Sequence, residues 1–329
     1  MVDNVCFSLP GLAAMEAAVR NPYSRWDKIK GIGSDCFLPK LNPKFQIGKE
    51  KPVFAIGCCF SQGIQMALNA QGFDLITFRE MSPRREFFMQ QVAGESYHYP
   101  LHFFLRYSLA SMAQEIDRIL GDSVLNSDAL FYKRDTEILD LHYNAEFPLS
   151  SMSDSIERRQ HIREHLTHLK SAGLMIITLG LIEVWLDRET GLYLNAAPPF
   201  GALIDAPLRY QLNIMDWRTT YALAERMIDQ ILSANPELKI VLMVSPTMQD
   251  TTFAPNDLTV SSSHSKATLI SVARELAYAN SSVDYLPTWE MAALSDPRRV
   301  WEKDGRHTQN EFVQVMMTHF VNSYMSIST

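Results

Sequence analysis

The chain has 329 residues, of which 47% are hydrophobic and 20% are charged, and its formal net charge is −7. This composition is typical of a globular protein with a sizeable core, and the negative charge argues against a general nucleic-acid-binding protein. The N-terminal sequence lacks the basic and apolar segments of a secretory signal, and the longest apolar runs are too short to cross a bilayer. We therefore expect a cytoplasmic protein whose partners are neither nucleic acid nor membrane.

Five short apolar segments predict the strands of one sheet, at residues 52–57, 73–78, 174–180, 239–246 and 283–287. Their apolar residues are continuous rather than alternating, which is typical of strands covered on both faces and therefore of a parallel sheet. Apolar residues at helical spacing predict helices over residues 61–70, 155–169, 217–232, 265–278 and 308–324. This alternation predicts a doubly wound α/β fold, in which a mainly parallel five-stranded sheet lies between two layers of helices.

Two longer segments interrupt the alternation. Residues 80–148 are mostly helical in pattern and rich in aromatic side chains, so we expect them to form a helical cap over the carboxyl edge of the sheet. Residues 187–213 are rich in Pro and Gly, and we expect a long loop there, of the kind that usually has a function. Because no linker divides the sequence, we expect a single domain over residues 1–329.

Cys58 and Cys59 stand side by side in the stretch FAIGCCFSQGIQMAL, directly after the first predicted strand. In open α/β sheets ligands bind at the carboxyl ends of the strands. Cys58 would begin the following helix, where backbone N–H groups and the helix dipole lower the pKa of a thiol. We therefore expect Cys58 to be a nucleophile, although cysteine is also common as a small buried residue. Ser61, one turn into the helix, is the competing nucleophile.

The other cysteines and the histidines give little support to a disulfide or a metal centre. The four cysteines show no C-x-x-C spacing, and a disulfide between adjacent residues would be strained, so we expect reduced thiols. The segment HIREHLTH places His161, His165 and His168 at spacings that can bind zinc. It lacks the acidic residue of an H-E-x-x-H motif, and we interpret it as a solvated helix. We expect neither a metal nor a cofactor.

Asp304 and His307 form an Asp-x-x-His sequence just before the last predicted helix, within WEKDGRHTQNEF. This spacing lets the carboxylate accept a hydrogen bond from one imidazole nitrogen while the other nitrogen faces outward as a base. The alternative interpretation is an exposed polar turn in which Thr308 caps the following helix.

Taken together, these segments resemble a known family. A nucleophile after the first strand and Asp-x-x-His before the last helix is similar to the layout of SGNH (GDSL-type) hydrolases. The stretch IGCCFSQGI resembles the Gly-Ser-Cys-Phe-Ala signature of the GSCFA family in that clan. Similar segments follow in the family's order: IITLGLIEVW at 176–185, VSPT at 244–247, SHSKATLI at 263–270 and VDYLPTWEM at 283–291. The resemblance extends over residues 53–320, almost the whole chain.

The resemblance implies the roles of several residues. Cys58 stands where the family has its nucleophilic Ser, and Cys59 stands where the family has its Cys, so Cys59 would be a packed neighbour. SGNH hydrolases stabilise the oxyanion with the nucleophile's N–H, a Gly N–H and an Asn side chain. Gly180 would supply the second of these donors. Glu183 stands where the Asn is sought, and because an ionised Glu cannot donate, it would orient a substrate amine or hydroxyl or be structural.

Ser245 and Lys266 complete the predicted site. Ser245 belongs to the segment that resembles the family's Val-Ser-Pro strand end, and Lys266 belongs to the segment that resembles its Ser-Lys helix start. Lys266 would either contact an anionic group near the pocket or be a surface lysine at a helix N-terminus.

The predicted reaction is acyl transfer through a covalent thioester on Cys58, with His307 as the base and Asp304 fixing the imidazole. Because a thioester reacts readily with amines and thiols, we favour an acyltransferase whose donor is an acyl thioester such as acyl-CoA or an acyl-carrier protein. The alternatives are an esterase or thioesterase, and a non-catalytic binding protein on the same fold. Asp304 and His307 argue against the last, since a binding protein needs no base.

Overall fold

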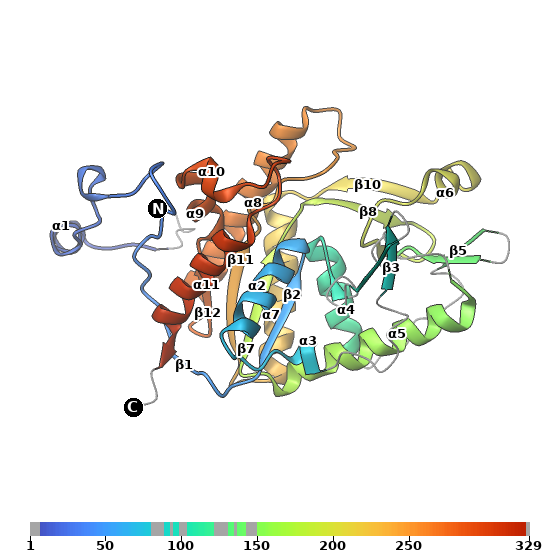
Figure 1. The fold of residues 1–329 in the computed structure, drawn as a ribbon, viewed down its shortest axis with the longest axis horizontal. Helices are drawn as coiled ribbons and strands as arrows, with labels where there is room; N and C mark the ends of the chain where they lie inside the picture. Colours follow the sequence, from blue (N-terminus) through green and yellow to red (C-terminus); the bar gives the residue numbers. More distant parts are fainter. Residues whose placement is uncertain are drawn as a thin grey trace.

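The computed structural model describes residues 7–79, 89–92, 95–98, 104–121, 131–134, 137–142 and 150–326 (Figure 1). At its centre lies a sheet of four parallel strands in the order β12-β11-β7-β2. Their bounds are Val283–Leu286 (β12), Lys239–Val244 (β11), Leu174–Leu179 (β7) and Val53–Gly57 (β2). The predicted parallel sheet flanked by helices is confirmed, and the carboxyl ends of β2, β7 and β11 meet at one edge.

The second predicted strand, at residues 73–78, is not a strand of this sheet. Leu75 makes a single parallel bridge with Val53, and the chain then enters the short helix α3 (Ile76–Arg79). Phe73, Leu75 and Ile76 are all buried. A short buried apolar run has the same sequence pattern in a helix turn and in a strand. The prediction of a strand at residues 73–78 was therefore wrong, and the sheet has four strands rather than five.

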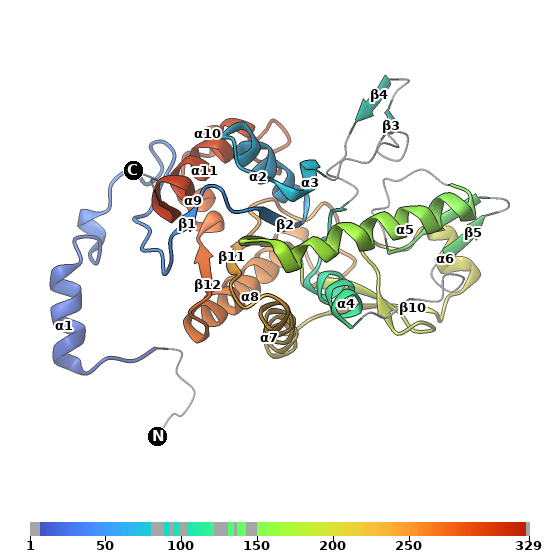
Figure 2. The same cartoon turned by 90° about the horizontal axis from the view of Figure 1, so that it is seen from below.

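Alternate residues of the strands face two separate hydrophobic cores. Phe54 and Ile56 of β2 pack with α4, α5, α7 and α8, whereas Val53 and Ala55 pack with α2, α9 and α11. The two views show these helix groups on opposite faces of the sheet (Figure 1, Figure 2). The bounds are Cys59–Ala70 (α2), Leu109–Leu120 (α4), Met152–Thr167 (α5), Trp217–Ala234 (α7), Leu258–Ala279 (α8), Thr288–Leu294 (α9) and Asn310–Tyr324 (α11).

The segment after β7 forms a second sheet beside the first. Strands β8 (Glu183–Asp187), β9 (Leu192–Tyr193) and β10 (Tyr210–Ile214) are antiparallel in the order β10-β8-β9. The short helix α6 (Phe200–Asp205) lies between β9 and β10. Residues 187–213, for which we expected a long loop, therefore contain secondary structure of their own.

Much of the expected cap at residues 80–148 lies outside the described residues. Its described parts are α4 and two antiparallel hairpins. The hairpin strands are Met89–Val92 (β3) with Glu95–His98 (β4), and Phe131–Arg134 (β5) with Glu137–Asp140 (β6).

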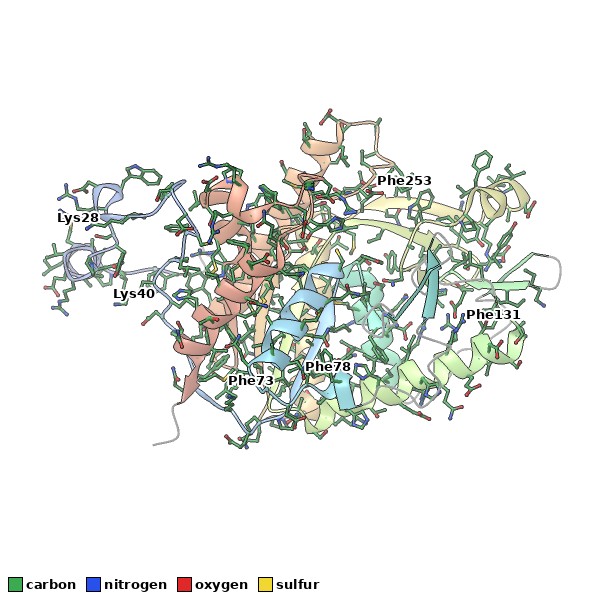
Figure 3. The ribbon with its side chains drawn as sticks, viewed as in Figure 1. Lys28, Lys40, Phe73, Phe78, Phe131 and Phe253 are labelled. Atoms are coloured by element: carbon green, nitrogen blue, oxygen red, sulfur yellow. The ribbon has the colours of Figure 1, made fainter. Side chains whose placement is uncertain are left out.

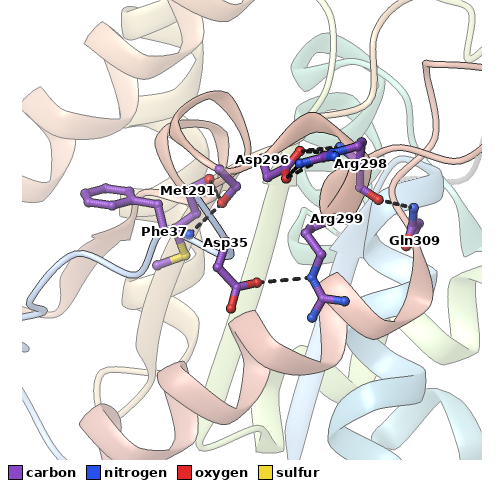
Figure 4. A network of polar contacts seen from close by, with 8 residues as sticks. Asp35, Phe37, Met291, Asp296, Arg298, Arg299 and Gln309 are labelled. Carbon is purple, nitrogen blue, oxygen red and sulfur yellow. Dashed lines mark hydrogen bonds and ion pairs between the residues drawn. The ribbon is translucent and has the colours of Figure 1, made fainter. Parts of the chain in front are cut away.

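The segment before β2 contacts the residue that follows α9 and the short helix α10 (Pro297–Val300). The Phe37 N–H donates to Ser295 Oγ at 2.7 Å, and Asp35 forms an ion pair of 3.1 Å with Arg299 (Figure 4). Helix α1 (Gly11–Arg20) has no buried residue and extends from the body in both views (Figure 2). No helix among the described residues has the length and apolar character needed to span a bilayer.

Gly57 makes possible the close approach of β2 to β7. A Cβ at residue 57 would lie 2.6 Å from both Cβ and the carbonyl oxygen of Thr178. We expect Gly57→Ala to lower the free energy of unfolding by about 1–3 kcal/mol, since backbone cannot move aside at low cost. Gly63→Ala in α2 is the matched control, because there the nearest atom would lie at 3.4 Å, on Val313. Urea unfolding checks both variants, and an equal loss in the two would contradict this account.

Candidate active site

Cys58 lies where β2 meets α2. It is the N-cap residue of that helix, and 4% of its surface is exposed. The Ser61 N–H donates to the Cys58 carbonyl oxygen at 2.8 Å, so the helix begins directly at this residue. The thiol is therefore held at the positive end of the helix dipole, where an anion is stabilised.

Two neighbouring strands place Gly180 and Ser245 against Cys58. Gly180 follows β7, and a Cβ there would lie 3.3 Å from the Cys58 Cβ and 2.5 Å from the Tyr107 carbonyl oxygen. Ser245 follows β11 and is fully buried. Its hydroxyl has no hydrogen bond of full geometry among the described residues, but it lies near enough to the Cys58 sulfur to lower the thiol pKa.

Lys266 reaches the same point from α8. Its side chain is buried, and its Nζ donates to the Gly180 carbonyl oxygen at 3.1 Å. Burial lowers the pKa of Lys266 to about 8, although the nearby thiol groups of Cys58 and Cys59 oppose this shift. The lysine that we expected at the surface or beside a substrate anion is therefore an interior neighbour of the cysteine pair.

The surroundings of Cys58 favour its thiolate. A hydrogen bond from Cys59 lowers its pKa most, and Ser245, the Lys266 charge and the Phe60 N–H act in the same direction against the effect of burial. The resulting pKa of Cys58 is about 6. The pKa of Cys59 is raised, chiefly by its hydrogen bond to Cys58 and by burial. At neutral pH the site therefore holds a Cys58 thiolate close to a Lys266 ammonium group.

His307 and Asp304 form the expected pair in the turn between α10 and α11. His307 Nδ1 lies 2.6 Å from Asp304 Oδ2, and the N–H groups of Arg306 and His307 donate to Asp304 Oδ1 at 2.9 and 3.0 Å. These two N–H groups and the imidazole hold the pKa of Asp304 well below its usual range. The turn is closed by a hydrogen bond of 2.8 Å from the Glu302 N–H to the His307 carbonyl oxygen.

Arg306 fixes the tautomer of His307. Its Nη1 lies 3.1 Å from His307 Nε2, and because a guanidinium has no acceptor, Nε2 must accept this hydrogen bond. The proton of the neutral ring therefore resides on Nδ1, where it is donated to Asp304. This is the tautomer in which Nε2 acts as a base.

A pocket of about 570 Å³ brings most of the predicted residues together. We call it the Cys58 pocket, and it is lined by Cys58, Cys59, Gly180, Ser245, Lys266 and His307, among others. Asp304 lies behind His307 rather than on the wall. Ser61, the competing nucleophile, is fully buried and does not line this pocket.

Glu183 lies outside the Cys58 pocket and supports a loop that borders it. Its carboxylate accepts hydrogen bonds from Gln249 Nε2 at 3.2 Å, Thr252 Oγ1 at 2.8 Å and the Phe253 N–H at 2.6 Å. Phe253 packs edge-on against Trp185 and lies beside the antiparallel sheet of β8 and β10 (Figure 3). Glu183 thus positions residues 249–253 rather than facing the Cys58 thiol.

Neither Arg306 nor Asp250 was predicted from the sequence, and both line the Cys58 pocket. Arg306 stands one residue before His307, so its position next to this histidine was visible in the sequence. Asp250 had no such signal, because its place depends on the fold of the loop that Glu183 holds.

The described residues contain no disulfide and no group of three or more side chains arranged to bind a metal ion. Cys36, Cys58 and Cys59 are reduced, whereas Cys6 lies outside the described residues. His165 of the HIREHLTH segment is buried, and its ring lies against Phe54 and Phe104.

The fold and site define an α/β protein with a cysteine, a histidine and an aspartate at the carboxyl edge of a parallel sheet. The model of the GSCFA family matches residues 52–320, and the chain belongs to this family. No curated protein matches the chain.

Several solved structures show a distant likeness in fold. The family 3 carbohydrate esterase of Clostridium thermocellum is 9% identical, with 83% of this chain and 94% of that chain covered and a TM-score of 0.35. A putative GDSL-like lipase from Parabacteroides merdae is 12% identical, with 87% and 99% covered and a TM-score of 0.34.

The charge on Lys266 should control the ionisation of Cys58. In the wild-type protein, alkylation of Cys58 by iodoacetamide should follow a pKa of about 6. In Lys266→Met the pH midpoint of Cys58 alkylation should rise, because the thiolate loses a neighbouring positive charge. The alkylation rate at the pH of the wild-type midpoint should therefore fall several-fold. Peptide-resolved mass spectrometry separates Cys58 from Cys36.

Lys239→Met is the matched control, since Lys239 is a partly buried lysine at the other end of β11, where its Nζ donates to Ser282. It should leave the Cys58 profile unchanged. An unchanged profile in Lys266→Met would show that this lysine is not the counter-ion of the thiolate.

Glu183→Gln should weaken the loop at residues 249–253. The substitution replaces one carboxylate oxygen by an NH2 group that faces either the Phe253 N–H or the Gln249 and Thr252 donors, so the free energy of unfolding should fall by about 1–3 kcal/mol. Urea unfolding measures this, with Glu225→Gln on the exposed face of α7 as the control. Unchanged stability together with complete loss of Cys58 reactivity would instead indicate a direct role in the site.

Proposed function

We propose that this protein is an acyltransferase that carries the acyl group on Cys58 as a thioester. One observation supports this above all others. A buried thiol with a pKa of about 6 shares a pocket with a histidine whose Nδ1 is held by Asp304. A stabilised thiolate is already deprotonated, so it can attack a carbonyl carbon without a base to remove its proton.

The first step transfers the acyl group from donor to enzyme. The Cys58 sulfur attacks the carbonyl carbon of an acyl thioester, and a C–S bond forms while the donor's C–S bond breaks. The donor leaves as a thiolate, so no proton needs to move in this step. The N–H groups at the start of α2 and of Gly180 are the candidate donors to the tetrahedral oxyanion.

The second step passes the acyl group to an acceptor. His307 Nε2 removes the proton of the acceptor amine, hydroxyl or thiol as it attacks the thioester carbonyl. The C–S bond to Cys58 breaks, and Cys58 leaves as the stabilised thiolate. His307 then releases the acceptor's proton to solvent, which balances the negative charge of the donor thiolate released in the first step. Asp304 holds the imidazole and stabilises its positive charge.

The division of roles between Cys58 and His307 gives a sharp test. Because Cys59, Ser245 and Lys266 stabilise the thiolate without His307, the acyl adduct should still form in His307→Ala, at a rate within about tenfold of wild type. Turnover should fall by about 100- to 10,000-fold, since the acceptor loses its base. Asp304→Asn should show the same pattern with a smaller loss.

Intact mass spectrometry with a panel of acyl-CoA and acyl-pantetheine donors measures the adduct, and product formation with added amines measures turnover. If His307→Ala abolishes the adduct itself, the thiol depends on this histidine and the proposed division is wrong. Release of the acyl group to water at the same rate with or without acceptors would identify a thioesterase in place of a transferase.

A further inference from the structure

Arg306 extends along the wall of the Cys58 pocket and contacts the base. Its side chain is 27% exposed, and its two terminal nitrogens have different partners. Nη1 donates to His307 Nε2 at 3.1 Å, and Nη2 lies 3.3 Å from Asp250 Oδ1. The positive charge of Arg306 also acts on the cysteine pair, where it opposes the rise in the Cys59 pKa.

The hydrogen bond from Arg306 occupies the lone pair of His307 Nε2, which the second step of the proposed reaction needs. While Arg306 Nη1 donates to His307 Nε2, that nitrogen cannot take a proton from an acceptor. The guanidinium must therefore move before the second step can occur. A ligand that binds Arg306 more strongly than Asp250 does would supply the reason for such a movement.

The ion pair between Arg306 and Asp250 is suited to exchange. The Asp250 side chain is 80% exposed, and a solvated ion pair of this kind contributes little stability. The other cation that lines the pocket within the described part of the chain is Lys266, which lies beside the Cys58 thiolate and donates to Gly180. Arg306 is therefore the cation whose partner a negatively charged substrate can replace.

We propose that Arg306 is a specificity-determining residue that binds an anionic group, a carboxylate or a phosphate, on the acyl donor. The anion takes the place of the Asp250 carboxylate, and bidentate contact draws the guanidinium away from His307 Nε2. Binding of the correct donor thereby makes the base available. This proposal rests on the proposed acyl transfer, and it adds the chemical class of the donor.

Binding can be measured without turnover in Cys58→Ala. The probes are two pairs of thioesters that differ in one anionic group. In the first, S-butyryl- and S-succinyl-N-acetylcysteamine differ in a carboxylate on the acyl chain. In the second, S-butyryl-pantetheine and S-butyryl-phosphopantetheine differ in a phosphate on the carrier. Isothermal titration calorimetry should show tighter binding of the anionic member in one pair by at least about tenfold.

Adding Arg306→Gln to Cys58→Ala should remove this preference, whereas adding Arg298→Gln should not. Arg298 is the matched control because it is also paired with an aspartate, Asp296, but its side chain is 89% exposed and does not line the pocket. Asp250→Asn should strengthen binding of the anionic probe and leave the neutral probe unchanged, because it removes the competing carboxylate.

A preference for the anion that survives Arg306→Gln would overturn the proposal and point to Lys266, which lacks its thiolate partner in Cys58→Ala. Equal binding of both members of both pairs would also overturn it.

Turnover with Cys58 intact separates this proposal from the proposed function. Arg306→Gln should raise the rate with neutral thioesters, since His307 Nε2 is no longer occupied, and should raise the KM for the anionic donor by at least about tenfold. If the variant lowers both rates equally, Arg306 is required for the chemistry and is not a specificity residue. If the wild-type protein acylates with no thioester, neutral or anionic, the acyl-transfer mechanism fails, while the calorimetry still decides whether Arg306 binds anions.

Discussion

The site depends on keeping a charged sulfur inside the protein. Burial alone would raise the pKa of Cys58, because a thiolate is poorly solvated away from water. Four neighbours reverse this effect: the Cys59 thiol, the Ser245 hydroxyl, the Lys266 ammonium group and the Phe60 N–H. Lys266 is itself buried, so the sulfur and the ammonium group each make the other charge less costly. Removing either partner would leave an uncompensated charge in the interior.

The fold brings these groups together through the ends of three parallel strands. β2 leads into Cys58, β7 into Gly180 and β11 into Ser245, while Lys266 approaches from α8. Glycine at 57 allows β2 to approach β7 closely, and glycine at 180 leaves room for the Tyr107 carbonyl oxygen. The antiparallel sheet contributes to the site indirectly, because Glu183 at the start of β8 holds the loop that carries Asp250. The turn before α11 adds Arg306 and His307 to the lining of the pocket.

The sequence predicted the layers of the fold because strands covered on both faces have continuous apolar residues, as β7 and β11 do. It did not predict that residues 73–78 make only one bridge, since a short buried run has the same pattern in a turn of helix. The secondary structure within residues 187–213 was also not foreseen, because short antiparallel strands such as β9 leave little periodicity.

The sequence predicted those residues of the candidate site whose position follows from the order of strands and helices along the chain. Cys58, Asp304 and His307 flank elements whose positions follow from the α/β pattern. The environment of Lys266 was not predictable, because the sequence placed this lysine at a helix start, whereas α8 begins at Leu258 and holds Lys266 in its buried interior. The roles of Glu183 and Asp250 depend on hydrogen bonds between distant segments, which leave no local pattern in the sequence.

The most direct test of the account is to locate the acyl group on the protein. The wild-type protein is incubated with the acyl thioester that gives the largest adduct, digested, and mapped by peptide mass spectrometry, with neutral hydroxylamine to distinguish thioesters from amides. We expect a hydroxylamine-sensitive acyl group on Cys58 alone. An acyl group on Ser61 or Cys59, or a hydroxylamine-resistant amide on Lys266, would contradict it.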